Sequence, residues 1–171
     1  MIKYLFFAMA IAITLSLQLN LFAQTAEDYL EIGLDAYYGG DYQTAIENYN
    51  KAIKLNPDFA DVYDNRGYVK YNLKDYKGAV EDFTKSIEID SNHFEIYKNR
   101  GDAKYYLDDC KGAIKDYDKA IELFPDYYAA YYGRGCAKLK LDDNDGACLD
   151  LNKAGEHGLS EANDLIKKYC K

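Results

Sequence analysis

The sequence repeats itself with a period of 34 residues, and this period constrains the fold more strongly than any other feature. Four glycines are spaced at this interval, and alanine, tyrosine and aspartate form three further series with the same step. A fixed period of this length indicates a repeat architecture, in which each unit buries its apolar face against its neighbours. The four series are Gly33, Gly67, Gly101 and Gly135; Ala45, Ala79, Ala113 and Ala147; Tyr29, Tyr63, Tyr97 and Tyr131; and Asp41, Asp75, Asp109 and Asp143.

Each unit reads as two amphipathic helices of about a dozen residues, joined by a tight turn such as "GGDY", "LKDY" or "LDDC". The repeated aspartate stands where the second helix begins. A carboxylate at that place accepts hydrogen bonds from free backbone N–H groups and favours the positive end of the helix dipole. We therefore expect the four aspartates of this series to be N-caps.

The repeated glycine lies inside the first helix, where glycine costs about 1 kcal/mol relative to alanine. Its recurrence predicts that the two helices of a unit approach closely at this point. The simplest contact is between Gly33 and Ala45, with equivalent contacts in the other three units.

The chain contains three arginines, and each stands directly before a repeated glycine. If the two helices of a unit are antiparallel, these arginines lie beside an aspartate of the second helix. The first unit has Ile32 and Asn48 at the two positions, so arginine and aspartate are present together or absent together. A guanidinium can hold a carboxylate through two parallel hydrogen bonds, which an ammonium cannot do. We expect structural pairs of Arg66 with Asp82, Arg100 with Asp116, and Arg134 with Asp150; the alternative is that these arginines contact a ligand.

Taken together, these positions resemble the tetratricopeptide repeat (TPR) family, whose 34-residue pattern has a large aromatic, Leu-Gly, Ala, an aromatic, Ala and Pro. The resemblance covers residues 26 to about 159 as four repeats, at about 26–59, 60–93, 94–127 and 128–159. It implies an all-α, right-handed superhelical solenoid of four helix-turn-helix hairpins, with residues 160–170 as a C-terminal capping helix. The run "NKAGEHGLSEA" is also similar to Sel1-type repeats. In the first unit the pattern is met by Tyr29, Ile32, Gly33, Ala45, Tyr49, Ala52 and Pro57.

The N-terminal segment reads as a cleaved signal peptide over residues 1–23, so the repeat domain occupies residues 24–171. Lys3 precedes a short apolar run at 4–17, and "LFAQ" supplies a cleavage site after Ala23. A retained membrane anchor is the alternative. We expect an exported protein, in the periplasm, associated with the cell envelope or secreted, without membrane insertion once the signal is removed. The net charge of −8 without a basic block argues against nucleic acid as a partner.

The four cysteines all lie in the last third of the chain, which permits one or two disulfides in an oxidising compartment. Cys148 can pair with Cys136 on the opposing helix or with Cys170 on the cap, and free buried thiols are an open alternative. Cys110 occupies a packing position, so we expect it in the core.

No pattern in the sequence favours catalysis, a metal or a cofactor, so we expect a non-enzymatic protein. The two histidines, His93 and His157, each fall at the end of a repeat without a nucleophile or acid constellation. "LDDNDG" imitates the start of a calcium loop, but Leu141 and Asn152 would occupy its first and last ligand positions. The tripeptide "RGD" at 100–102 lies within a predicted helix rather than in an exposed loop.

The resemblance implies that the first helices of the repeats line a concave face. Leu30, Asp64, Lys98 and Tyr132 occupy one set of positions on that face. A row of tyrosine and asparagine at one-repeat spacing there suits binding of an extended peptide or a partner helix. The alternative is that these tyrosines only pack against the neighbouring repeat. The candidate partner-binding residues are Tyr37, Tyr38, Asn65, Tyr68, Tyr71, Asn99, Asp102, Tyr105 and Tyr106.

The best-known TPR ligand mode clamps a C-terminal carboxylate with Lys, Asn and Arg side chains, and most of that set is replaced here. Only one asparagine survives, as Asn65 or Asn99, and Asp64 stands where a cation is expected. The rim is acidic, so we expect a neutral or basic partner segment. The predicted function is an exported adaptor or assembly factor; the alternative is a structural or carbohydrate-associated module of the cell envelope. The rim carboxylates are Glu27, Asp61 and Glu95.

Overall fold

The computed structural model describes residues 25–170, and in this part of the chain every element of secondary structure is an α-helix. The predicted signal peptide, residues 1–23, lies outside the described residues. None of the described helices is both long and apolar enough to span a membrane. The helices are α2 (Ala26–Tyr38), α3 (Tyr42–Leu55), α4 (Ala60–Asn72), α5 (Tyr76–Ile89), α6 (Phe94–Tyr106), α7 (Cys110–Leu123), α8 (Tyr128–Lys140), α9 (Asn144–Glu156) and α10 (Ser160–Tyr169).

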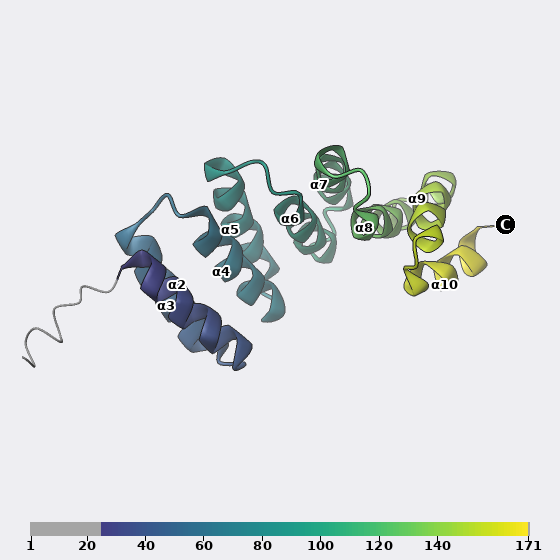
Figure 1. Cartoon of the computed structure of the whole chain (residues 1–171). Coiled ribbons are helices and arrows are strands. Elements are labelled where there is room, and N and C mark those ends of the chain that lie inside the picture. Colours follow the sequence, from purple (N-terminus) through teal and green to yellow (C-terminus); the bar gives the residue numbers. More distant parts are fainter. Residues whose placement is uncertain (1–24, 171) are drawn as a thin grey trace, which may run out of the picture.

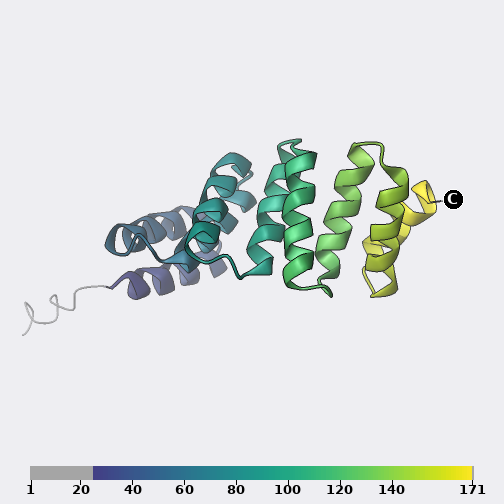
Figure 2. The same cartoon turned by 90° about the horizontal axis from the view of Figure 1, so that it is seen from above.

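The helices form hairpins that follow one another along an extended array (Figure 1). The pairs are α2 with α3, α4 with α5, α6 with α7, and α8 with α9, and α10 packs on α9 at the C-terminal end. The first helices of successive hairpins also contact one another, so α2, α4, α6 and α8 share one side of the array. From above, the hairpins are seen to stack side by side (Figure 2). The predicted all-helical array of hairpins with a terminal cap is confirmed.

The predicted N-caps are also confirmed. Asp41 accepts a hydrogen bond from the Thr44 backbone N–H at 3.1 Å, and the other three aspartates accept from the residue three positions on at 2.9–3.0 Å. The residue before each cap has a left-handed backbone, with φ of 82° at Gly40 and 63° at Lys74. This single left-handed residue turns the chain from the first helix of each hairpin into the second.

The repeated glycines make room for a ring or a branched side chain of the second helix. A Cβ at Gly33 would meet the ring of Tyr49, and one at Gly101 would lie 2.9 Å from the ring of Tyr117. The predicted close approach of the two helices is present, and Ala45 is fully buried. In the fourth hairpin, a Cβ at Gly135 would also lie 3.3 Å from the carbonyl oxygen of Ala147, the counterpart of Ala45. The large side chain one turn further along the second helix fills the remaining space between the helices. The four such side chains, fully or almost fully buried, are Tyr49, Phe83, Tyr117 and Leu151.

Each predicted arginine–aspartate pair is present, as a two-point fork between the helices of one hairpin. Arg100 donates from Nε to Asp116 Oδ2 at 3.0 Å and from Nη2 to Oδ1 at 2.6 Å. Lys104 adds an ion pair to the same carboxylate at 2.7 Å, and Arg100 Nη1 reaches back to Thr84 of the preceding hairpin at 3.2 Å. Asp116 is 4% exposed. The same arrangement recurs at Arg66, Lys70 and Asp82 and at Arg134, Lys138 and Asp150.

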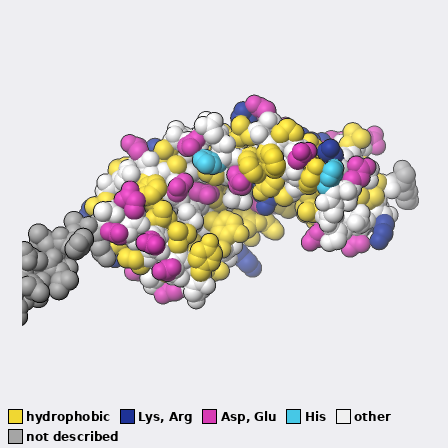
Figure 3. All heavy atoms as spheres, in the orientation of Figure 1, with side chains coloured by type: hydrophobic (Ala, Val, Ile, Leu, Met, Phe, Trp, Pro, Cys, Tyr) yellow, Lys and Arg dark blue, Asp and Glu magenta, His cyan; other side chains and the backbone are white. Residues whose placement is uncertain are grey.

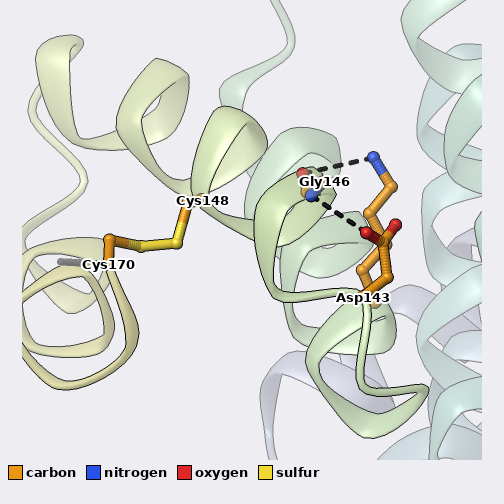
Figure 4. The surroundings of a disulfide bond; sticks show 5 residues. Asp143, Gly146, Cys148 and Cys170 are labelled. Carbon is orange, nitrogen blue, oxygen red and sulfur yellow. Dashed lines mark hydrogen bonds between the residues drawn. A yellow bond between two sulfur atoms is a disulfide. The ribbon is translucent and has the colours of Figure 1, made fainter.

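A disulfide joins Cys148 of α9 to Cys170 after α10, and it fastens the capping helix to the last hairpin (Figure 4). The sequence left this pairing open between two partners. Cys136 is a half-buried free thiol, and Cys110 is a free thiol buried in the core as predicted. Asp143, the predicted N-cap that resembled a calcium ligand, accepts a hydrogen bond from the Gly146 backbone N–H.

Candidate functional site

The side of the array formed by α2, α4, α6 and α8 carries two adjoining cavities, and we call this side the concave face. Side chains of the hydrophobic class, which includes tyrosine, gather in the hollow below the middle of the array (Figure 3, yellow). The larger cavity, which we call the anchor pocket, has a volume of about 340 Å³. The smaller one, of about 140 Å³, shares Tyr71, Lys98 and Asp102 with it. The anchor pocket is lined by Tyr71, Lys98, Asp102, Tyr105, Tyr106, Tyr117, Ala129, Tyr132, Gly133, Cys136 and Leu159.

A continuous series of tyrosine rings leads from the first hairpin to the anchor pocket. The ring of Tyr37 meets that of Tyr68 edge-on, with centroids 5.9 Å apart, and Tyr68 stacks near Tyr71 at 6.5 Å. Tyr71 in turn meets Tyr106 at 5.9 Å, and Tyr106 meets Tyr105 at 5.7 Å. Rings in such arrangements are rigid and give a large contact area with hydroxyl groups at the edge.

The floor of the anchor pocket is a polar network of three side chains from two helices. Tyr117 of α7 donates a hydrogen bond from its hydroxyl to Asp102 Oδ1 at 2.8 Å, and Lys98 Nζ lies 2.7 Å from Asp102 Oδ2. Burial, followed by the nearby charge of Asp102, raises the pKa of Tyr117, so its hydroxyl keeps the proton that it donates. Burial alone would lower the pKa of Lys98, but the charge of Asp102 and the hydrogen bond to it raise the pKa overall. Lys98 therefore stays an ammonium.

Two glycines let Tyr117 reach the concave face from the second row of helices. A Cβ at Gly133 would lie 2.6 Å from the end of the Tyr117 ring, and one at Gly101 would lie 2.9 Å from its side. The residues at the position of Gly133 in the two preceding repeats are Asn65 and Asn99. Gly133 thus departs from the repeat pattern at the place where the Tyr117 ring passes between α6 and α8.

The three-residue network belongs to the third repeat alone. The positions of Lys98, Asp102 and Tyr117 are held by Leu30, Leu34 and Tyr49 in the first repeat, by Asp64, Tyr68 and Phe83 in the second, and by Tyr132, Cys136 and Leu151 in the fourth. A feature that every repeat shares serves the architecture. The polar cluster occurs in only one of the four repeats, and it makes the third repeat a distinct part of the surface.

Asp64 is a second unusual group on the concave face. Its Oδ1 atom is shielded from solvent and has no hydrogen-bond partner among residues 25–170. Burial, followed by the charges of Asp61 and Glu95, raises the pKa of this carboxyl to about 6, although His93 acts in the opposite direction. Buried polar groups are nearly always paired in proteins, so an unpaired carboxylate oxygen requires an explanation.

The structure brings most of the sequence-predicted site residues to the two cavities. Six of the nine line them, and three do not. Tyr37 takes part in the series of rings, and Tyr38 is 80% exposed beside it. Asn65 donates to the Asp61 carbonyl of its own helix at 2.8 Å. The six that line the cavities are Tyr68, Tyr71, Asn99, Asp102, Tyr105 and Tyr106.

Other residues of the anchor pocket were missing from the predicted set. Lys98 and Tyr132 were placed on the concave face by the repeat register but were not selected. Tyr117 was not selected either, and only the irregular Gly133 gave a signal that it reaches the surface. Leu159, in the linker before α10, closes the pocket from the C-terminal end, and the repeat pattern contains no information about it.

Neither histidine lines the two cavities. His93 pairs with Asp90 at 3.1 Å, and His157 stacks on the Tyr128 ring at a centroid distance of 3.8 Å. Among the described residues, no group of three or more His, Cys, Asp or Glu side chains is arranged to hold a metal ion.

Comparisons with known proteins agree with the geometry. A family profile described as TPR repeat matches residues 33–74, and two described as tetratricopeptide repeat match residues 60–93 and 98–156. These profiles describe repeat modules of a usually non-catalytic class, and none describes a catalytic domain. A comparison with curated proteins gave no match.

Several solved structures are similar to the chain. The crystal structure of MamA protein is 26% identical, with a TM-score of 0.78 over 82% of this chain and 78% of that chain. The first TPR of Spaghetti (RPAP3), bound to an HSP90 peptide of sequence SRMEEVD, is 26% identical, with a TM-score of 0.68 over 70% of this chain and 95% of that chain. The Arabidopsis OM64 TPR domain is 31% identical, with a TM-score of 0.66 over 68% of this chain and 97% of that chain. With its 34-residue period, its hairpins and these matches, the chain belongs to the tetratricopeptide repeat family.

Proposed function

We propose that this protein is an exported, non-enzymatic adaptor or assembly factor that binds a peptide segment or a partner helix on its concave face. The observation that carries the proposal is the anchor pocket with its floor of Lys98, Asp102 and Tyr117. The pocket is walled by tyrosine rings, which supply contact area at little cost in side-chain entropy. Its polar floor offers N–H donors of Lys98 to a carbonyl of the bound segment.

The relatives support binding as the general role of this face. TPR domains are typically protein-protein interaction modules, and the similar RPAP3 domain was solved with a bound peptide. The peptide in that structure contains three acidic residues. The acidic rim and Asp64 of the present chain favour a segment without such a charge, because like charges repel across an interface.

Export is supported by two independent features. The sequence of residues 1–23 has the composition of a signal peptide. The disulfide between Cys148 and Cys170 is a bond that forms and persists in oxidising compartments such as the periplasm.

The test is affinity capture from a cell-envelope extract with residues 24–171 of the wild type, beside the double variant Tyr71→Ala/Tyr105→Ala. A matched control removes two aromatic rings elsewhere: Phe124, which is 42% exposed, and Tyr128, which stacks on His157. Circular dichroism must first show equal helicity for the three proteins. We expect the wild type and the control to capture a protein that the double variant does not capture. When this protein is purified, it should bind the purified wild type again.

Equal capture by all three proteins would contradict a binding site on the concave face. Saturable binding of purified cell-wall polymer in place of any protein would favour the alternative of a carbohydrate-associated module.

A further inference from the structure

Asp64 is a half-buried carboxylate without a Lys or Arg partner among the described residues. It lies on the concave face of α4, one turn before Tyr68, which lines the smaller cavity. Within the described residues, no salt bridge involves Asp64, and its Oδ1 atom has no hydrogen-bond partner. The groups that influence its charge most are two carboxylates, Asp61 and Glu95, and the imidazole of His93. His93 is itself hydrogen-bonded to Asp90.

The repeat architecture does not require an acid at this position. The equivalent residues in the other repeats are Leu30, Lys98 and Tyr132. Lys98 shows what an internally satisfied charge at this position looks like, because it pairs with Asp102 four residues on. The residue four positions after Asp64 is Tyr68, which has no charge. Asp64 therefore lowers the stability of the isolated fold, and a charge retained at such a position indicates an external partner.

The surroundings define the charge of that partner. The first turns of α2, α4 and α6 carry Glu27, Asp61 and Glu95, so the N-terminal ends of these helices form an acidic margin along the face. Lys98, which holds the equivalent position in the next repeat, is already bound to Asp102. A Lys or Arg side chain of a partner is thus complementary to this end of the face, and an acidic segment is not.

We propose that the concave face takes a basic peptide segment, in which a Lys or Arg side chain pairs with Asp64 while a bulky apolar or aromatic side chain occupies the anchor pocket. This inference rests on the proposed function and adds the chemistry of the partner to it. The tyrosine-lined cavity provides the second point of attachment, which fixes the position of the segment along the face.

The test uses a randomised dodecapeptide display library as the probe, selected against the disulfide-intact protein at physiological salt. Three proteins are compared: the wild type, Asp64→Asn, and the matched charge control Asp164→Asn. Asp164 is 87% exposed on α10, away from the concave face. The wild type and the control are expected to enrich peptides with Lys or Arg near an aromatic or large aliphatic residue. Asp64→Asn is expected to lose the preference for the basic residue and to keep the preference for the bulky one.

A selected peptide then serves in a fluorescence polarisation assay. Replacing its basic residue by Gln should weaken binding to the wild type by roughly tenfold and should change binding to Asp64→Asn little. Enrichment of acidic or neutral peptides, or a basic preference that survives in Asp64→Asn, would overturn this inference while leaving peptide binding on the concave face intact. Failure of all three proteins to enrich any peptide would overturn both this inference and the proposed function.

Discussion

Three arginines hold three almost fully buried carboxylates in this chain, and each carboxylate also receives a lysine. A buried carboxylate stabilises the fold where its charge is balanced and its oxygens are hydrogen-bonded. Asp116 meets both conditions through Arg100 and Lys104. On the concave face, Asp64 meets neither. The two kinds of aspartate are therefore expected to respond to substitution in opposite ways.

Replacing Asp116 with Ala should lower the free energy of unfolding by about 3 kcal/mol, because two cations lose their buried partner. The matched control is Asn48→Ala, at the same register in the repeat that has no arginine. It removes one hydrogen bond, to the Thr44 carbonyl, and should cost about 1 kcal/mol. Chemical denaturation of the three proteins measures both effects. A stability unchanged in Asp116→Ala would contradict a structural role for the fork, and binding on the concave face is expected to survive in this variant.

Asp64 makes stability depend on pH in a direction opposite to that of a carboxylate held in an ion pair. Its folded-state pKa of about 6 lies above the ordinary value of 3.8, so the folded state binds the proton more tightly. The stabilisation that comes from protonating Asp64 is complete below pH 4, decreases as the pH rises from 4 to 6, and is lost above pH 6. Relative to Asp64→Asn, the wild type should gain about 2 to 3 kcal/mol between pH 7 and pH 4. Denaturation curves for both proteins across this range isolate the effect, and a constant difference would contradict it.

At the scale of the helices and turns, the hairpin connections form a natural comparison series. Each uses one left-handed residue directly before the N-cap, but the four repeats place different residues there: Gly40, Lys74, Asp108 and Asp142. Glycine adopts this conformation freely, aspartate visits it more often than most residues, and lysine has no such advantage.

Lys74→Gly should therefore stabilise the second hairpin. The relieved backbone strain of roughly 1–2 kcal/mol exceeds the roughly 0.4–1 kcal/mol of added freedom in the unfolded chain, which leaves a gain of about 0.5 kcal/mol. Gly40→Ala, at the equivalent place in the first hairpin, should have the opposite sign. Thermal unfolding of the two variants measures both changes in stability. A loss of stability in Lys74→Gly would contradict this account of the turn.

Much of the fold could be predicted because it recurs. The N-caps, the hairpins and the arginine forks each appear at a fixed offset in several repeats, and the joint absence of Arg and Asp in the first repeat identified the pairs. The third member of each fork was missed, since Lys104 reads as an ordinary exposed helix residue. The route of Tyr117 to the concave face was missed because it depends on Gly133 of the following repeat. Features that join neighbouring repeats, or that occur once, leave no periodic signal.

For the molecule as a whole, the C-terminal end is fixed covalently. The disulfide between Cys148 and Cys170 holds α10, and it should contribute about 3 kcal/mol for a loop of 22 residues. Addition of a reductant is expected to lower the melting temperature of the wild type and to leave that of Cys148→Ala/Cys170→Ala unchanged. Thiol titration of the denatured protein supplies the check: two thiols should react before reduction, from Cys110 and Cys136, and four after it. Four reactive thiols in the unreduced protein would contradict the bond.

The first hairpin contains no arginine fork, since it has Ile32 and Asn48 at the paired positions. The ion pairs that join the helices of a hairpin are consequently distributed unevenly along the array. Local opening should require the least free energy in α2 and α3. Their amide protons are expected to exchange with solvent sooner than those of α6 to α9. Tyr37 and Tyr38 thus lie on the part of the concave face that opens most readily, and the anchor pocket lies on the more stable part. Such a gradient would let one end of the face adjust to the length and thickness of a bound segment while the other end holds its position.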